Sequence, residues 1–185
     1  MHRYDFLVVG GGPVGCRVAY KLAAAGHQVA VLEKNASVGG PICCTGIVSR
    51  ECISRFAIPA NLILKELRSA TVYPPSAKPL RVERPNMQAA AIDRGADNAF
   101  MAREAQDQGA DYFMAHHVTS IKVEPDQVVV TAENKGNHLM FEARAVLLAT
   151  GFSSRLPEQA GLGKPKRRAV GALSLIHISE PTRPY

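Results

Sequence analysis

Three glycines and one acid near the start of the chain have the spacing of a dinucleotide-binding turn. Gly10, Gly12 and Gly15 follow the apolar run 6–9. The first glycine permits a tight turn, the second lets the backbone approach a diphosphate, and the third lets a helix pack closely on a sheet. Glu33 lies at about the distance at which a carboxylate binds a ribose hydroxyl. Because an acid there disfavours a 2′-phosphate, the pattern predicts FAD or NAD rather than NADP.

The residues around these glycines predict a strand, a turn, an amphipathic helix over 13–25 and a second strand. Pro13 suits the first helical turn, where no amide donor is needed. The helix start would present free N–H groups and a positive dipole end to a diphosphate. We therefore also place Pro13 and Lys34 in the predicted cofactor site. The side chains expected to face the sheet are Val14, Val18, Leu22 and Ala25.

The middle of the chain predicts a change of structure. A short helix is expected near Ser49, and the proline-punctuated segment 65–85 alternates as antiparallel strands joined by a turn would. We expect this segment to begin a substrate domain. An apolar strand over 88–92 then leads into a helix over 94–108, with Phe100, Met101 and Ala105 facing inward.

From residue 111 onward the pattern is typical of strands. The predicted strands are 111–115, 118–123, 127–132, 138–142 and 145–148. The last of them delivers Thr150 and Gly151 to the carboxyl edge of the sheet, where ligands bind in α/β folds. A three-strand antiparallel excursion that returns to a core strand fits a dinucleotide-binding α/β fold better than a plain doubly wound sheet. We expect residues 1–64 and 86–172 to form this incomplete cofactor domain.

The final stretch, 173–185, fits nothing before it. LSLIHISEPTRPY resembles the read-through translation of a transposase-type sequencing-library adapter. We therefore predict that it is a non-native tail and exclude it from the fold. On this reading the natural protein is longer, and resequencing the native locus tests the prediction.

Composition narrows the class of protein. The chain has 185 residues and a net charge of +6, but its basic residues are scattered except at 164–168, which favours a solvated loop over a nucleic-acid site. No apolar run approaches the length of a membrane span, so we expect a cytoplasmic protein. The adjacent thiols of Cys43 and Cys44 do not form a zinc-ligand pattern, so we expect reduced cysteines and no metal. His116 and His117 are expected to face solvent.

Four segments in order resemble the geranylgeranyl reductase family of FAD-dependent oxidoreductases. They are GGGPVG with Glu33, GGPICCTGIVS at 39–49, IDRGADNAFMAREAQDQGA at 92–110 and LLATGFSSRLPEQAGL at 147–162. The resemblance implies a Rossmann-like FAD-binding fold of the glutathione-reductase and aromatic-hydroxylase type. It also implies an enzyme that saturates carbon–carbon double bonds of isoprenoid chains, with flavin re-reduced by a nicotinamide or ferredoxin-type donor. A lipid substrate makes peripheral membrane contact an expectation as well.

The resemblance implies further roles for residues of this chain. Arg94 would hold the diphosphate region, Val118 the adenine through its backbone, and Gly151 would lie near the cofactor. Cys44 and Gly46 would face the flavin edge, where a thiol could tune the flavin or carry protons; burial as a small packing residue is the alternative for Cys44.

Two departures from the family's motifs bear on the alternatives, which are a flavin monooxygenase and a module that is inactive by itself. In hydroxylases the last motif reads Asp-Gly-x-x-Ser-x-x-Arg, whereas Thr150 and Pro157 stand at the Asp and Arg positions here, which argues against a flavin monooxygenase. The Gly-Asp motif that would cover the pyrophosphate is absent from the sequence. The chain as printed could therefore be a nucleotide-binding module that is inactive by itself.

Overall fold

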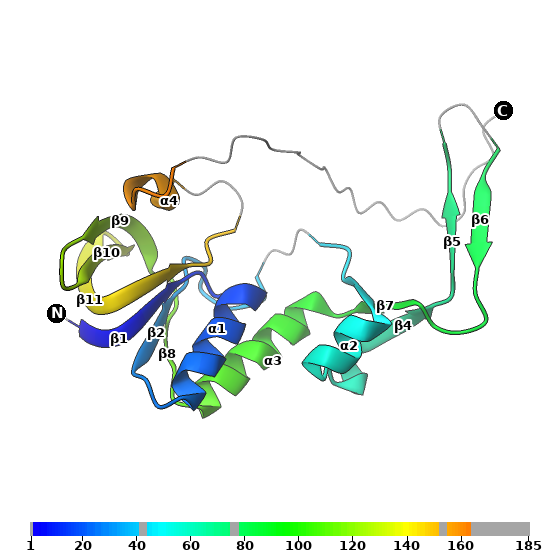
Figure 1. Cartoon of the computed structure of the whole chain (residues 1–185), viewed down its shortest axis with the longest axis horizontal. Helices are drawn as coiled ribbons and strands as arrows, with labels where there is room; N and C mark the ends of the chain where they lie inside the picture. Colours follow the sequence, from blue (N-terminus) through cyan, green and yellow to red (C-terminus); the bar gives the residue numbers. More distant parts are fainter. Residues whose placement is uncertain (1, 41–43, 75–77, 152–154, 164–185) are drawn as a thin grey trace.

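A six-stranded sheet forms the centre of the protein. The structure is a computed structural model that describes residues 2–40, 44–74, 78–151 and 155–163. Four strands are parallel, in the spatial order β8 (Asp111–Phe113), β2 (Val29–Leu32), β1 (His2–Val9) and β11 (Asn137–Leu148). The antiparallel strands β10 (Val128–Asn134) and β9 (His117–Val123) follow beside β11 (Figure 1). The predicted α/β class, with an antiparallel excursion, is confirmed.

The parallel strands are apolar because both of their faces are covered. All four residues of β2 are buried, as expected for a central parallel strand. Leu7 and Leu32 pack on one face with Phe141, while Val8 and Val31 pack on the other face under the helices. This burial fixes the register of β1 and β2, so that both strands have their carboxyl ends at the same edge of the sheet.

Helix α1 (Pro13–Ala24) follows β1 and lies on the sheet (Figure 1). Its predicted extent is confirmed, but the predicted buried face is wrong at two positions, since Val14 is 68% exposed and Ala25 is also exposed. Val18 and Leu22 are only partly buried at the margin of the core. The face against the sheet is formed instead by small residues, Gly15, Cys16, Ala19 and Ala23. Small side chains let the helix axis approach the sheet closely, which the branched residues would prevent.

The other predicted helices also form, and side chains cap both. The Asp93 carboxylate accepts a hydrogen bond from the Ala96 amide at the start of α3 (Arg94–Asp107). The Ser49 hydroxyl accepts one from the Cys52 amide at the start of α2 (Arg50–Phe56). In α3, Ala105 is fully buried and Met101 partly buried, whereas Phe100 is 37% exposed, so its predicted inward orientation is wrong.

Two smaller antiparallel sheets lie beyond α2. One consists of β3 (Ile47–Ser49), β7 (Ala89–Ile92) and β4 (Ile63–Leu67). The 3-10 turn η1 (Ala60–Leu62) leads into β4. The other pairs β5 (Ser69–Val72) with β6 (Leu80–Glu83), which confirms antiparallel strands within 65–85. Every residue of β5 and β6 is exposed, and the pair extends away from the central sheet in Figure 1. That 65–85 begins a substrate domain remains a proposal.

Two strands predicted separately, 138–142 and 145–148, form the single strand β11. Residues 137–143 pair with β10 and residues 141–148 pair with β1, so the strand is paired on both sides at 141–143 and its charged residues do not interrupt it. The tight turn before it has Lys135 and Gly136 both at positive φ, as two-residue hairpin turns require. Beyond β11, the short helix α4 (Leu156–Gln159) buries Leu156 against the core. The predicted tail, 173–185, lies outside the described residues.

Among the described helices, none combines the length and apolar character needed to cross a membrane.

Candidate nucleotide site

A cleft of about 370 Å³ opens where β1, β2 and β11 end and α1 begins. Most of the predicted cofactor residues line it together: Gly10, Gly12, Glu33, Lys34, Val118, Thr150 and Gly151. These residues come from four separated segments of the chain. The parallel register of the strands brings their carboxyl ends to one edge, which is where open α/β sheets bind ligands.

Two of the glycines are required by the backbone itself. Gly10 has φ +108°, and a Cβ there would overlap the carbonyl oxygen of Ala149. A Cβ on Gly15 would overlap the carbonyl oxygen of Gly10. The turn from β1 into α1 therefore exists only because neither residue has a side chain, as the glycine spacing predicts.

Gly12 differs from the other two, because a Cβ built on it meets no atom within 4 Å. It occupies the N-cap position of α1, where no side chain caps the helix and no acid lies in the first turn. Within the described part of the chain, no side chain therefore fills the space beside the amides at this end. Uncapped amides and the positive helix end are a good fit for a diphosphate.

Glu33 closes the cleft on the β2 side. Its side chain is 7% exposed, and its two oxygens accept hydrogen bonds from the amides of Gly11, at 2.6 Å, and Asn35, at 2.9 Å. These bonds fix the carboxylate beside the glycine turn. Each carboxylate oxygen has a second lone pair, so a ribose hydroxyl could still donate to it. The geometry is therefore compatible with the predicted ribose contact.

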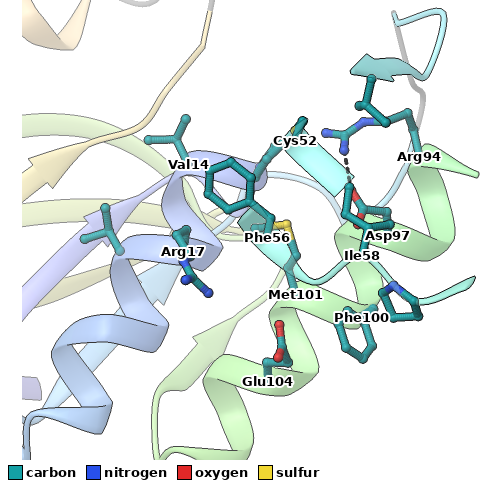
Figure 2. Close-up of a pocket in the computed structure, with 14 residues that line it drawn as sticks. Val14, Arg17, Cys52, Phe56, Ile58, Arg94, Asp97, Phe100, Met101 and Glu104 are labelled. Atoms are coloured by element: carbon teal, nitrogen blue, oxygen red, sulfur yellow. Dashed lines mark hydrogen bonds and ion pairs between the residues drawn. The ribbon is translucent and has the colours of Figure 1, made fainter. Parts of the chain in front are cut away.

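Arg94 and Pro13 lie elsewhere. Both line a second cavity of about 350 Å³, with mainly apolar walls from α1, α2 and α3 (Figure 2). The Arg94 guanidinium is turned back on its own helix, where it forms an ion pair with Asp97 and donates to the Asn98 side chain at 3.1 Å. The structure thus does not bring Arg94 into the cleft with Gly12; its ion pair holds it in the neighbouring cavity.

Asp97 offers a test of how burial and the ion pair balance at this position. Burial raises the pKa of the Asp97 carboxyl above its usual range, and the Arg94 guanidinium offsets part of that rise. The folded state therefore keeps this proton to higher pH than the unfolded state does. We expect the free energy of unfolding of the wild type, relative to Asp97→Asn, to fall as pH rises above about 4.

Urea unfolding of both proteins across this pH range measures the difference. Asp107→Asn, at the exposed end of α3, is the matched control for the change in net charge. A difference that grows with pH would show that the Arg94 guanidinium outweighs the burial of Asp97, and a constant difference would show that the two effects cancel; either result would contradict the expected fall.

The loop that carries Cys44 and Gly46 is anchored to the start of α3. Gly46 is buried at φ +69°, and a Cβ on it would meet the carbonyl oxygen of Ile92 and the Arg94 side chain. Its amide lies 3.4 Å from the exposed Cys44 sulfur, within hydrogen-bonding distance. Cys44 is therefore not a buried packing residue. Residues 41–43 of this loop lie outside the described part of the chain.

His116 was missed by the sequence analysis. The expected exposure holds for His117 but is wrong for His116, which is 9% exposed and lines the cleft beside Glu33. Its position two residues before Val118 is the only signal that could have indicated it. Asn35, Ala149 and Leu156 also line the cleft. No sequence pattern distinguishes these three from ordinary loop and core residues.

Comparison with curated proteins finds reductases of isoprenoid compounds. Digeranylgeranylglycerophospholipid reductase of Thermoplasma acidophilum is 29% identical over 88% of this chain and 43% of its own length. Geranylgeranyl diphosphate reductase of Rhodobacter capsulatus is 28% identical over 83% of this chain and 39% of its own length. The chain therefore spans less than half the length of these relatives.

Solved structures give the same fold. A geranylgeranyl bacteriochlorophyll reductase-like protein from Thermoplasma acidophilum superposes with a TM-score of 0.78 at 28% identity, covering 87% of this chain and 42% of that one. The p-nitrophenol 4-monooxygenase of Pseudomonas putida superposes with a TM-score of 0.73 at 18% identity, covering 87% of this chain and 44% of that one. At that identity the second likeness shows the fold alone.

The resemblance predicted from the four sequence segments is confirmed by these relatives. In addition, a family profile described as pyridine nucleotide-disulphide oxidoreductase matches residues 4–176, nearly the whole chain. The glycine turn, the ordered carboxylate and the uncapped helix start all lie within the matched range. This chain belongs to the pyridine nucleotide-disulphide oxidoreductase family.

Proposed function

We propose that the chain is the FAD-binding part of an oxidoreductase that reduces carbon–carbon double bonds of an isoprenoid lipid or a similar hydrophobic alkene. The observation that carries the cofactor assignment is the carboxylate of Glu33, held by the Gly11 amide at the uncapped start of α1. The reaction is supported by the names of relatives at 28% and 29% identity.

In this proposal the residues of the cleft bind the ADP half of FAD. Gly10, Gly12 and Gly15 allow the diphosphate to approach the amides of α1, and Glu33 accepts from the ribose. Thr150 and Gly151 line the same cleft at the end of β11. The flavin would supply the hydride, and the protein would position it and exclude water.

The flavin half would extend past Pro13 toward the loop of Cys44 and Gly46. Support comes from that loop, which is anchored on Arg94 and Ile92 beside the apolar second cavity. An exposed thiol at Cys44 is compatible with proton delivery or with tuning of the flavin. An external nicotinamide or ferredoxin-type donor would re-reduce the cofactor, and a lipid substrate would bring the protein to a membrane surface.

The experiment combines the purified chain, FAD, a chemical reductant and geranylgeranyl diphosphate without oxygen. Yellow cofactor that stays with the chain before the reductant is added, followed by a product with two added hydrogens per double bond, would support the proposal. A product hydroxylated only when oxygen is present would favour a flavin monooxygenase instead. Bound FAD without either product would indicate a nucleotide-binding module that lacks activity by itself, and no bound FAD would contradict the cofactor assignment.

A further inference from the structure

Cys16 lies near the start of α1, and the proposed function gives it no role. Among the cysteines that the structure describes it is the fully buried one, since Cys44 is exposed and Cys52 half-buried. Burial raises the pKa of the Cys16 thiol, and the nearby charge of Glu33 adds to the rise. The sulfur therefore keeps its proton at neutral pH and can donate a hydrogen bond.

The acceptor of this hydrogen bond belongs to the glycine turn. The Cys16 sulfur lies 3.2 Å from the Gly11 carbonyl oxygen, and no other described group donates to that oxygen. The peptides on either side are held by other bonds: the Gly11 amide donates to the Glu33 carboxylate at 2.6 Å, and the Cys16 amide donates to the Gly12 carbonyl at 2.9 Å. The thiol therefore holds the Gly11–Gly12 peptide, which these two bonds leave free.

A peptide between two glycines needs such a restraint. Neither residue has a side chain that resists rotation of the peptide plane, so both orientations of the plane are accessible. In a trans peptide the carbonyl and the N–H point in opposite directions. Because the Gly11 oxygen points to the buried thiol, the Gly12 N–H points away from it. Gly12 lines the cleft, and its amide has no acceptor among the described groups.

We propose that Cys16 is a positioning residue for the diphosphate: by holding the Gly11 carbonyl inward, its thiol directs the Gly12 N–H into the cleft as an anion donor. This inference rests on the proposed function. Hydrogen bonds in a chain polarise one another, so an anion that accepts from the Gly12 N–H makes the Gly11 oxygen a stronger acceptor for the thiol. The thiol and the diphosphate thus bind opposite sides of one peptide and stabilise each other.

Two variants separate the hydrogen bond from the packing of the side chain. Cys16→Ala removes the donor, whereas Cys16→Ser keeps one. Tyr112→Phe is the matched control, because it removes a buried hydroxyl near the same sulfur without touching the glycine turn. Each protein is titrated calorimetrically with ADP and with adenosine, which has no diphosphate. We expect Cys16→Ala to weaken ADP binding about fivefold or more, the other two variants to change it less than about twofold, and adenosine to bind all four proteins alike.

Infrared spectroscopy gives a second readout, which a packing role would not move. The S–H stretching band of Cys16 is the one that Cys16→Ser lacks. We expect ADP, but not adenosine, to move this band of the wild type to lower wavenumber, because the S–H bond weakens as its hydrogen bond strengthens.

Three results would overturn the inference and leave the proposed function intact. They are a Cys16→Ala protein that binds ADP as the wild type does, equal losses of ADP and adenosine or of Cys16→Ala and Cys16→Ser, and an S–H band that ADP does not move. A wild-type chain that binds neither ADP nor FAD would overturn both.

Discussion

Gly12→Asp is expected to lower ADP affinity at least about 100-fold, or about 2.8 kcal/mol, while leaving the stability of the fold almost unchanged. The backbone of Gly12, at φ −74° and ψ −177°, suits any residue, and a Cβ there meets no atom within 4 Å. Aspartate is a good N-cap, so its carboxylate would bind the amides that now face the cleft. It would also place a negative charge where the diphosphate is proposed to lie.

The measurement is a calorimetric titration with ADP together with urea unfolding of the same preparations. Gly12→Asn is the matched control, because asparagine has nearly the same shape without the charge, and we expect a loss of only about tenfold. An aspartate variant that binds ADP as the wild type does would show that the diphosphate lies elsewhere.

Gly15→Val is expected to have the opposite signature, a large loss of stability, because this residue packs against the backbone of the turn. Its Cβ would overlap the Gly10 carbonyl oxygen, and a backbone atom cannot move aside without opening the turn between β1 and α1. We expect the free energy of unfolding to fall by about 3 kcal/mol or more, a large part of the total for a domain of this size.

Urea unfolding at constant ionic strength measures this loss. Gly12→Ala serves as the control, because it adds a methyl group to the same turn in open space and should cost less than about 1 kcal/mol. Equal stability of the Gly15→Val and Gly12→Ala proteins would show that the turn is not as tightly closed as the structure has it.

The part of the site that was predicted from sequence is the part encoded locally. Gly10, Gly12 and Gly15 lie within one turn, and Glu33 ends the next strand, so a single βαβ unit fixes their relative positions. Val118, Thr150 and Gly151 were also placed at the cleft, through the family resemblance and the expected strand end. Their presence beside Glu33 depends on the parallel register of β1, β2 and β11.

The errors arise where packing between distant segments decides the outcome. Hydrophobic periodicity favoured Val14 as a buried residue of α1, but the sheet accepts only the small residues beside it. Ala25, also predicted to be buried, lies past the helix end as its C-cap. His116 is buried because Phe113 and Phe141, far apart in sequence, meet around it. Arg94 is a separate case, because its partner lies on its own helix: it forms an ion pair with Asp97, three residues along α3, in the neighbouring cavity.

The most direct test of the account compares ADP with 2′-phospho-ADP in calorimetric titrations of the printed chain. The account holds that a diphosphate lies over the start of α1 while Glu33 accepts from the ribose, so ADP should bind and the 2′-phosphate should weaken binding at least about tenfold. Equal or tighter binding of 2′-phospho-ADP would contradict it.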